Sequence, residues 1–252
     1  DTTFGQAITG LVTDALGPVA GIETKEIITY DINTVDFGPI FSKAKATGAD
    51  FIYQVSTVNP QVISSQYVKL QVPMPMTGVN VGAFGMEYWE DTGGAGGGIS
   101  TLSPVPSVGF DLDPVNAQFV SDYQAKYSTR PSMPHFNGFN AFHGLKQAMA
   151  AAAEAGGFKD VKAWNAAMLK QDLRLEKDGK LWLRYGFWQH GEVEPVTGRT
   201  YPQNAKFDLT PPFDEAQPSM VVIQWKEDGS VGVVYPFEYA NTEFEVPSWI
   251  KN

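Results

Sequence analysis

Side chains that commonly carry catalytic or metal chemistry are few in this sequence. It contains three histidines and no cysteine, which excludes disulfides, thiolate metal sites and a cysteine nucleophile. His135 and His143 are eight residues apart and could share a helical face, but no HExxH pattern and no carboxylate at metal-ligand spacing accompanies them. We interpret these two and His190 as structural histidines and predict no metal site.

Two other patterns look like reactive motifs without completing them. Residues 93–98 are glycine-rich, but they lack the Gly-Lys-Ser/Thr ending of a phosphate loop and the strand-to-helix context of a dinucleotide fold. We interpret them as a turn and predict no cofactor. No GxSxG nucleophile elbow occurs, and the acid pair Glu90-Asp91 is typical of solvated loop carboxylates. The sequence therefore gives no support to an enzyme.

Composition indicates a globular protein and argues against a nucleic-acid or membrane-surface partner. The 252 residues are 43% hydrophobic and 18% charged, enough for one large α/β domain or two lobes. The formal net charge of −10 argues against binding to nucleic acid or docking on an anionic membrane. No apolar stretch approaches the roughly 20 residues of a membrane span. The first residues lack the features of a signal peptide, so in an exported protein the signal would lie upstream.

The elements that position any site alternate between helix and strand in the first third of the chain. Apolar periodicity and caps predict helices over residues 4–16, 36–48 and 60–72. Apolar runs predict strands over residues 23–30, 51–56 and 74–78. Repeated strand–helix units of this kind indicate a parallel sheet with helices on both faces.

The remainder of the chain changes character. We expect a strand and a crossover near residues 100–108, followed by helices that begin near residues 114, 137 and 160. Three strands are predicted over residues 181–188, 220–225 and 231–235, and Asp228-Gly229 predicts a hairpin turn between the last two. Residues 192–218 read as an ordered surface excursion.

Several segments, in this order, are similar to those of one family. They are the aromatic-glycine helix start at residues 3–6, the Asp-Phe helix and following strand at 34–51, the aromatic helix at 119–131, the helix start at 139–142 and the closing strand pair at 222–236. Together they resemble the branched-chain amino-acid-binding proteins, which are type I periplasmic binding proteins. The likeness extends to about residue 240.

The resemblance implies an α/β fold of two lobes, with parallel sheets flanked by helices and with the first lobe incomplete. Residues 1–105 would form the first segment of the second lobe and residues 106–218 a first-lobe segment. Residues 219–240 would return to the second lobe, and residues 241–252 would form a C-terminal tail. Family members begin with a further segment that builds most of the first lobe. We therefore expect a missing N-terminal portion or a companion chain to complete it.

The resemblance also implies a function. Two lobes close like a hinge on a small-molecule solute, and the closed form docks on an ABC transporter permease. The protein would be periplasmic, or extracellular and membrane-tethered in a Gram-positive organism, and would not itself insert into the membrane.

Ligand sites of open α/β sheets lie at the carboxyl ends of strands. This rule puts Ser56 and Thr57 at the cleft after one predicted strand, and Asn80 after the next. Their side chains would hydrogen-bond the solute. The alternative for each residue is an ordinary turn or core role.

Three phenylalanines are candidates for the apolar part of the site. Phe4 heads the first helix, whose N-terminus can also orient a polar group. Phe136 and Phe139 are the candidates from the other lobe, with Phe4 and Phe139 as apolar walls. Core packing is the alternative for each.

One departure from the family bears on the solute. Amino-acid binders of the family place a carboxylate after the strand that corresponds to residues 74–78, where it pairs with the ligand ammonium. This sequence has Val79-Asn80 there, and a buried ammonium without an anionic partner is costly. Unless Glu87 reaches in, we expect an amide, urea-like, aromatic or carboxylate solute rather than a simple α-amino acid.

Two other function classes stay open. A ligand-sensing domain of a signalling or regulatory protein can share this fold, but it would need an output module. An enzyme on a doubly wound sheet would need a nucleophile–base pair or a metal cluster, and the sequence offers neither.

Overall fold

The computed structural model divides the chain into two compact units. Unit 1 comprises Asp1–Phe110 and Met220–Asn252, and unit 2 comprises Asp111–Ser219. The structure describes residues 1–103, 114–171, 173–177, 180–188, 191–193, 200, 204–207 and 220–250. Three predictions lie outside these residues. They are the crossover after residue 103, most of the surface loop expected over residues 192–218, and the structural role of His190.

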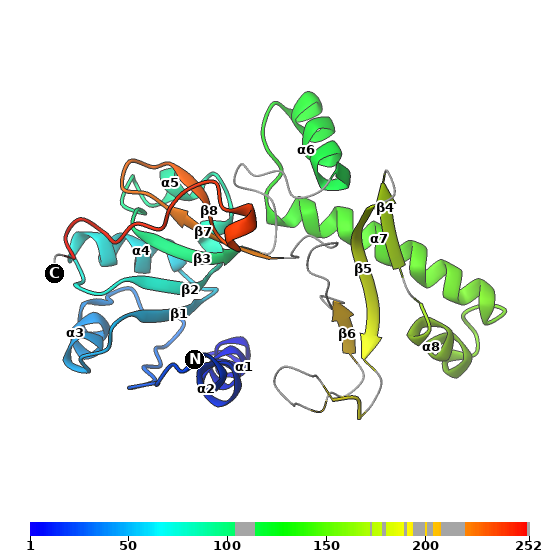
Figure 1. The fold of residues 1–252 in the computed structure, drawn as a ribbon, viewed down its shortest axis with the longest axis horizontal. Coiled ribbons are helices and arrows are strands. Elements are labelled where there is room, and N and C mark those ends of the chain that lie inside the picture. Colours follow the sequence, from blue (N-terminus) through cyan, green and yellow to red (C-terminus); the bar gives the residue numbers. More distant parts are fainter. Residues whose placement is uncertain are drawn as a thin grey trace. The chain divides into compact units, whose positions relative to one another are not determined.

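Unit 1 is an α/β layer structure whose helices and strands alternate along the chain (Figure 1). Its helices are α1 (Thr3–Leu11), a π-helical stretch (Val12–Leu16), α2 (Gly17–Ala20), α3 (Gly38–Ala46), α4 (Pro60–Lys69), a 3-10 turn (Val81–Phe84), α5 (Tyr88–Asp91) and a second 3-10 turn (Phe237–Tyr239). Its strands are β1 (Ile52–Ser56), β2 (Met76–Asn80), β3 (Ile99–Ser103), β7 (Val221–Trp225) and β8 (Val231–Tyr235).

The five strands of unit 1 form one mixed sheet in the order β1-β2-β3-β7-β8. Strands β1, β2 and β3 are parallel, as expected for strand–helix units, and this confirms the predicted α/β class. The other two strands, β7 and β8, pair antiparallel to their neighbours, so the sheet is mixed rather than parallel throughout. The predicted hairpin explains part of this: Asp228 accepts the Ser230 backbone N–H at 2.9 Å and Gly229 has φ 86°, so the chain reverses at once.

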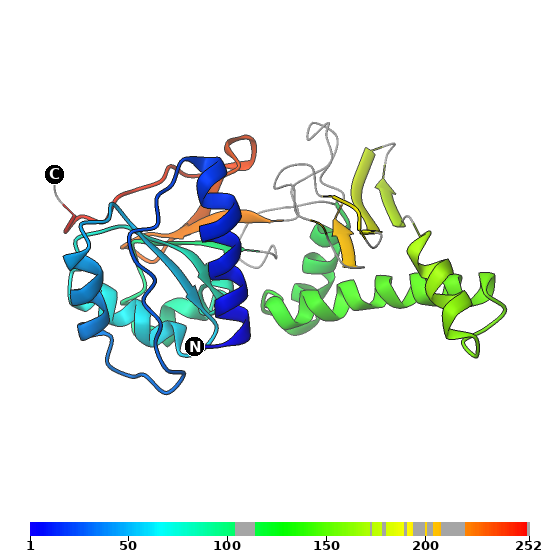
Figure 2. The ribbon, with the colours of Figure 1, turned by 90° about the horizontal axis from the view of Figure 1, so that it is seen from below.

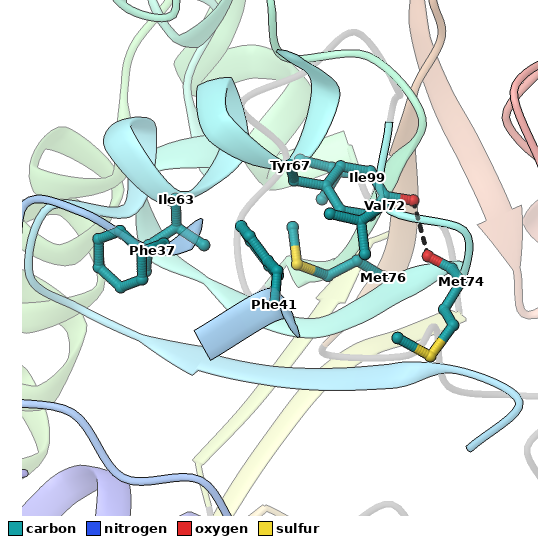
Figure 3. Close-up of a cluster of buried hydrophobic side chains, with 8 residues drawn as sticks. All are labelled: Phe37, Phe41, Ile63, Tyr67, Val72, Met74, Met76 and Ile99. Atoms are coloured by element: carbon teal, nitrogen blue, oxygen red, sulfur yellow. Dashed lines mark hydrogen bonds between the residues drawn. The ribbon is translucent and has the colours of Figure 1, made fainter. Parts of the chain in front are cut away.

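One face of this sheet is closed by an apolar core between the strands, α3 and α4 (Figure 3). Its buried members are Phe37, Phe41, Ile63, Tyr67, Val72, Met74, Met76 and Ile99. The Tyr67 hydroxyl satisfies its polar requirement by donating to the Met74 carbonyl at 3.0 Å. Trp249 packs on the Tyr67 ring with centroids 5.7 Å apart, and its indole N–H donates to the Val72 carbonyl at 3.1 Å. The C-terminal segment is thus bound to unit 1.

The predicted end of the first helix at Gly17-Pro18 is wrong. The chain continues through a π-helical stretch into α2 and ends at Gly21, which has φ 69°. A Cβ at Gly17 would lie 2.8 Å from the Val12 carbonyl oxygen, so glycine permits this widened turn. Pro18 lies in the first turn of α2, where a missing backbone N–H is tolerated.

The predicted strand over residues 23–30 is also absent. Residues 22–30 run without helix, strand, turn or bend. Their composition favours a strand, with Ile27, Ile28, Thr29 and Tyr30 in sequence. A β-strand also needs a hydrogen-bonding neighbour, and among the described residues none pairs with this segment.

Unit 2 contains three helices and a separate three-stranded sheet. The helices are α6 (Pro114–Tyr127), α7 (Met133–Glu154) and α8 (Val161–Leu169), and the strands are β4 (Leu173–Lys177), β5 (Lys180–Trp188) and β6 (Asn204–Phe207). The helix starts near residues 114 and 160 are confirmed, the latter with Asp160 accepting backbone N–H groups of Lys162 and Ala163. The sheet is antiparallel throughout rather than parallel.

The close approach of β1 and β2 at Gly78 leads to a first prediction. A Cβ at Gly78 would lie 2.2 Å from the Gln54 backbone oxygen, and the residue has φ 121°. We expect Gly78→Ala to lower the free energy of unfolding by roughly 2–4 kcal/mol in urea denaturation, because strain and a backbone clash add. Gly93→Ala is the matched control, since Gly93 has φ 63° and open space around it. Equal losses in the two variants would contradict the clash.

Candidate solute-binding site

The carboxyl ends of β1 and β2 bring three of the predicted polar residues together. Ser56 and Asn80 are direct partners in the parallel register, and Thr57 follows β1 immediately. Ser56 is 2% exposed and its hydroxyl donates to the Val58 carbonyl at 3.1 Å, which fixes the turn after β1. Thr57 is exposed. Of the β1 pair, Thr57 is therefore the residue whose side chain can reach a solute directly.

The Asn80 side chain is committed to internal hydrogen bonds. Its amide nitrogen donates to Ser64 Oγ at 2.9 Å and to Gln54 Oε1 at 3.4 Å, and its oxygen accepts the Ala83 backbone N–H at 3.3 Å. Its own backbone N–H donates to Thr101 Oγ1 at 2.9 Å. Asn80 is only 1% exposed. Through these hydrogen bonds it joins β1, β2, β3 and α4, and its side chain caps the following 3-10 turn.

Phe4 lies in the first turn of α1, where Thr2 caps the helix by accepting the Gly5 backbone N–H at 3.0 Å. The Phe4 side chain is 43% exposed and so is available as an apolar wall. The structure thus gives this residue the local setting that the sequence predicts, at a capped helix N-terminus with a free aromatic side chain.

Phe136 and Phe139 lie about one turn apart on α7 in unit 2 and join an aromatic cluster. The Phe119 ring contacts both, with centroids 5.3 Å from Phe136 and 4.5 Å from Phe139. Phe136 is 0% exposed and serves the interior of its unit. Phe139 is half-buried, and it is the member of the pair with surface left for a solute.

Tyr30 is a residue near the strand ends that the sequence did not select. Its hydroxyl donates to the Val55 carbonyl at 3.4 Å. Burial raises the pKa of Tyr30, so the phenol stays protonated and acts as a donor near neutral pH. Its place at the end of a β-prone run was the signal available in the sequence.

An apolar groove crosses unit 1 away from these residues. It has a volume of about 390 Å³ and is lined by Phe51, Pro75, Thr77, Ser100, Val222, Val234, Tyr235, Phe237 and Phe244. Phe51 and Pro75 precede β1 and β2, so the groove lies toward the amino ends of these strands. None of the six predicted site residues lines it.

The described histidines have structural surroundings. His135 Nδ1 accepts the Ser132 backbone N–H at 3.0 Å and completes a capping box at the start of α7. His143 Nε2 is buried and has no hydrogen-bond partner among the described residues. Within the described parts of the chain, no cluster of three or more histidines and carboxylates could hold a metal ion. No described helix is long and apolar enough to span a bilayer.

The Asn80 network gives a prediction about stability. We expect Asn80→Ala to lower the free energy of unfolding by about 1–3 kcal/mol, because Gln54 on β1, Ser64 on α4 and the Ala83 backbone N–H lose their hydrogen bonds to this side chain. Chemical denaturation measures the loss. Thr57→Ala, at the neighbouring exposed position, is the control and should stay within about 0.5 kcal/mol of the parent. A stable Asn80→Ala variant would show that these bonds are dispensable.

His143 gives a prediction about pH. Burial lowers the pKa of His143, and the nearby positive charge of Lys146 lowers it further. The unfolded chain keeps the ordinary value near 6.5, so the unfolded state takes up the proton first as the pH falls. The neutral His143 therefore contributes stability above pH 6.5, and this contribution is lost as the pH falls through the lowered pKa of His143 in the folded protein.

Urea titrations between about pH 7.5 and 5 measure this loss. We expect the His143→Gln variant to depend less on pH over the same interval. An unchanged pH dependence in that variant would assign the effect to other groups.

Comparisons with known proteins agree on the fold. A family model described as "Periplasmic binding protein" matches residues 1–187. A candidate branched-chain amino acid ABC transporter from Silicibacter pomeroyi is 18% identical and covers 99% of this chain and 59% of its own, with a TM-score of 0.65. An extracellular ligand-binding receptor from Rhodopseudomonas palustris is 14% identical, covers 93% of this chain and 61% of its own, and has a TM-score of 0.63. No protein with a curated description matches.

A third similar structure is a branched-chain amino acid ABC transporter periplasmic ligand-binding protein from Burkholderia xenovorans. It is 15% identical and covers 93% of this chain and 56% of its own, with a TM-score of 0.56. At such identities the likeness establishes the fold, and the chain spans about three fifths of the length of these structures. Because the family model covers residues 1–187 of 252, the chain belongs to the periplasmic binding protein family.

Proposed function

We propose that this chain is the solute-binding component of an ABC transporter, which captures a small polar or amphipathic molecule between two hinged lobes. Unit 1 acts as the second lobe and unit 2 as a first-lobe segment. The observation that carries the proposal is the family match over residues 1–187, together with the convergence of Ser56, Thr57 and Asn80 at the carboxyl ends of two adjacent parallel strands.

Within this proposal the six predicted residues divide by accessibility. Thr57 and Phe4 on unit 1 and Phe139 on unit 2 have exposed or half-exposed side chains and contact the solute. Ser56, Asn80 and Phe136 are buried, and they position the contacting groups rather than touch the ligand. Backbone N–H groups after β1 and β2 supply further hydrogen bonds, as is common at strand ends.

The solute class follows from charge. Residues 56–59 and 79–82 contain no carboxylate, so the two strand ends offer an α-ammonium group no anionic partner. Glu87, the one acid raised as an alternative, is exposed and lies at the N-terminal cap of α5. An amide, urea-like, aromatic or carboxylate molecule satisfies hydroxyl and backbone donors without such a partner.

Capture works as a population shift. A solute that binds the closed form better than the open form shifts the equilibrium toward the closed form. To change a closed-to-open ratio of 1:99 into 99:1, its affinity for the closed form must be about 10⁴-fold higher. The closed form then docks on a permease from the periplasmic side. This transport role, rather than catalysis, accords with the binding-protein family to which the chain belongs.

The proposal includes further polypeptide that completes the first lobe, either an N-terminal portion or a companion chain. Support comes from α7, where Phe142, Leu145 and Met149 are 55%, 56% and 56% exposed at helical spacing. Such a stripe is suited to packing against another layer. The similar structures, which are longer than this chain, are compatible with that arrangement.

A matched ligand series tests the function on the full-length protein. We expect 4-methylpentanoate or its amide to raise the melting temperature and L-leucine, which adds only the ammonium group, to bind at least about tenfold more weakly by calorimetry. Thr57→Val should weaken binding of the preferred ligand without loss of stability. Micromolar leucine binding would overturn the solute class. Absence of any stabilising ligand across amides, ureas, aromatics and carboxylates would overturn solute capture.

A further inference from the structure

The apolar groove of unit 1 lies on the face of the sheet that α3 and α4 do not cover. Met76 on β2 pairs with Ile99 on β3, and both side chains belong to the core beneath these helices. Successive side chains of a strand alternate between the two faces, so Thr77 and Ser100, the next residues along, share the opposite face and line the groove. Figure 2 shows the C-terminal segment (red) on this face and α4 (cyan) on the other.

Two hydroxyl groups in the groove have no partner within the described chain. Ser100 is 3% exposed, and neither its hydroxyl nor that of the half-buried Thr77 hydrogen-bonds any other described residue. Buried hydroxyls of folded proteins are nearly always hydrogen-bonded. The Ser100 hydroxyl is therefore a buried polar group that a molecule bound in the groove can satisfy.

The lining of the groove carries no charge. None of the nine described residues that form it is acidic or basic. Glu245 is adjacent in sequence to the lining residue Phe244, but its carboxylate pairs with the Lys226 ammonium at 3.1 Å. An anion would find no cation in the lining and an ammonium group would find no acid, and either would lose its hydration. The groove is therefore complementary to an uncharged molecule.

One wall of the groove is held in place from both sides. The Glu245 backbone exchanges two hydrogen bonds with the Gln224 side chain, at 2.7 and 2.8 Å. The buried Lys226 ammonium donates to the Glu243 carbonyl. Phe244 lies between these two anchored residues, so this wall is already formed before a ligand arrives. Such preorganisation lowers the cost of binding.

The size and the aromatic content of the groove narrow the ligand class further. The volume of about 390 Å³ lies in the range of small-molecule sites, roughly 300–1,000 Å³. Four of the lining residues are aromatic, and the rings of Tyr235 and Phe237 meet edge to face with centroids 5.4 Å apart. Phe237 and Phe244 are 80% and 51% exposed. Aromatic walls of this kind favour a flat ring system, which can contact their faces and edges.

We propose that this groove is a second ligand site, which binds a small uncharged molecule with a flat apolar body and one neutral hydrogen-bonding group. The body packs against Val222, Val234 and the aromatic walls, and its polar group hydrogen-bonds the Ser100 hydroxyl. The groove lies toward the amino ends of β1 and β2, whereas the candidate solute residues lie at their carboxyl ends. The site is therefore separate from solute capture, and either proposal can fail without the other.

Calorimetry with 2-naphthol and naphthalene tests the ligand class. We expect 2-naphthol to bind roughly fivefold more tightly, which is the net effect of one neutral hydrogen bond. A groove without a free partner would favour naphthalene, because the hydroxyl would be desolvated without gaining a new hydrogen bond. 2-Naphthoate, which has a carboxylate in place of the hydroxyl, should bind more weakly than 2-naphthol. No binding of 2-naphthol, or tighter binding of either relative, would overturn the proposal.

Three variants locate the site. Ser100→Ala should weaken 2-naphthol binding to the level of naphthalene and leave naphthalene binding unchanged. Ser103→Ala is the matched control, because Ser103 is 1% exposed on the other face of the same strand, and it should alter neither affinity. Thr57→Val should also leave 2-naphthol binding unchanged. A loss in Thr57→Val, or equal effects of the two serine variants, would overturn the assignment to the groove.

Nuclear Overhauser contacts in the parent protein make the test independent of how the variants fold. We expect the ring protons of bound 2-naphthol to show contacts with the methyl groups of Val222 and Val234. Contacts with Phe4 or Thr57 in their place would put the ligand at the strand-end site and overturn the groove.

Discussion

Asn80 is the residue on which the arrangement of the strand ends depends. A single carboxamide and the backbone N–H beside it join β1, β2, β3 and α4, and the same side chain caps the turn that follows β2. In a buried setting each such bond is strengthened by the low dielectric, and each unmade one is costly. These bonds tie β1 and β3 to the carboxyl end of β2, beside the candidate site.

The requirement that backbone polar groups be paired also explains why the hydrogen-bonded sheet of unit 1 is regular at its centre and stops at β1. Strands β3 and β7 each have a neighbouring strand on both sides, and Ile223 and Trp225 on β7 are almost fully buried. At β1 the ladder stops, a tyrosine hydroxyl takes the place of a strand donor, and the adjoining segment stays irregular. The composition of residues 22–30 favours a strand, so it is the lack of a hydrogen-bonding neighbour among the described residues that leaves this segment irregular.

Much of the fold could be predicted from the sequence because local signals and packing agree. The hairpin at Asp228-Gly229, the cap at Asp160 and the apolar runs of β1 and β2 each specify one structure. Residues 23–30 could not be predicted correctly, since strand formation there depends on a partner that periodicity does not reveal. For the candidate site, the strand-end rule selects Ser56, Thr57 and Asn80, which the structure places at two adjacent strand ends, but it cannot tell exposed Thr57 from internally bonded Asn80.

That distinction has a consequence for how such a site can recognise a solute. The buried amide of Asn80 is used inside the fold, so in the proposed site polar recognition on unit 1 would fall to hydroxyls and backbone groups, which are neutral. Neutral donors and acceptors discriminate well by shape and hydrogen-bond pattern, because an analogue that leaves one of them unpaired is penalised. They do not compensate the desolvation of a charge. The lack of an acidic side chain at the strand ends is therefore sufficient to favour neutral or anionic molecules over amino acids. No group that repels the amino acid is needed.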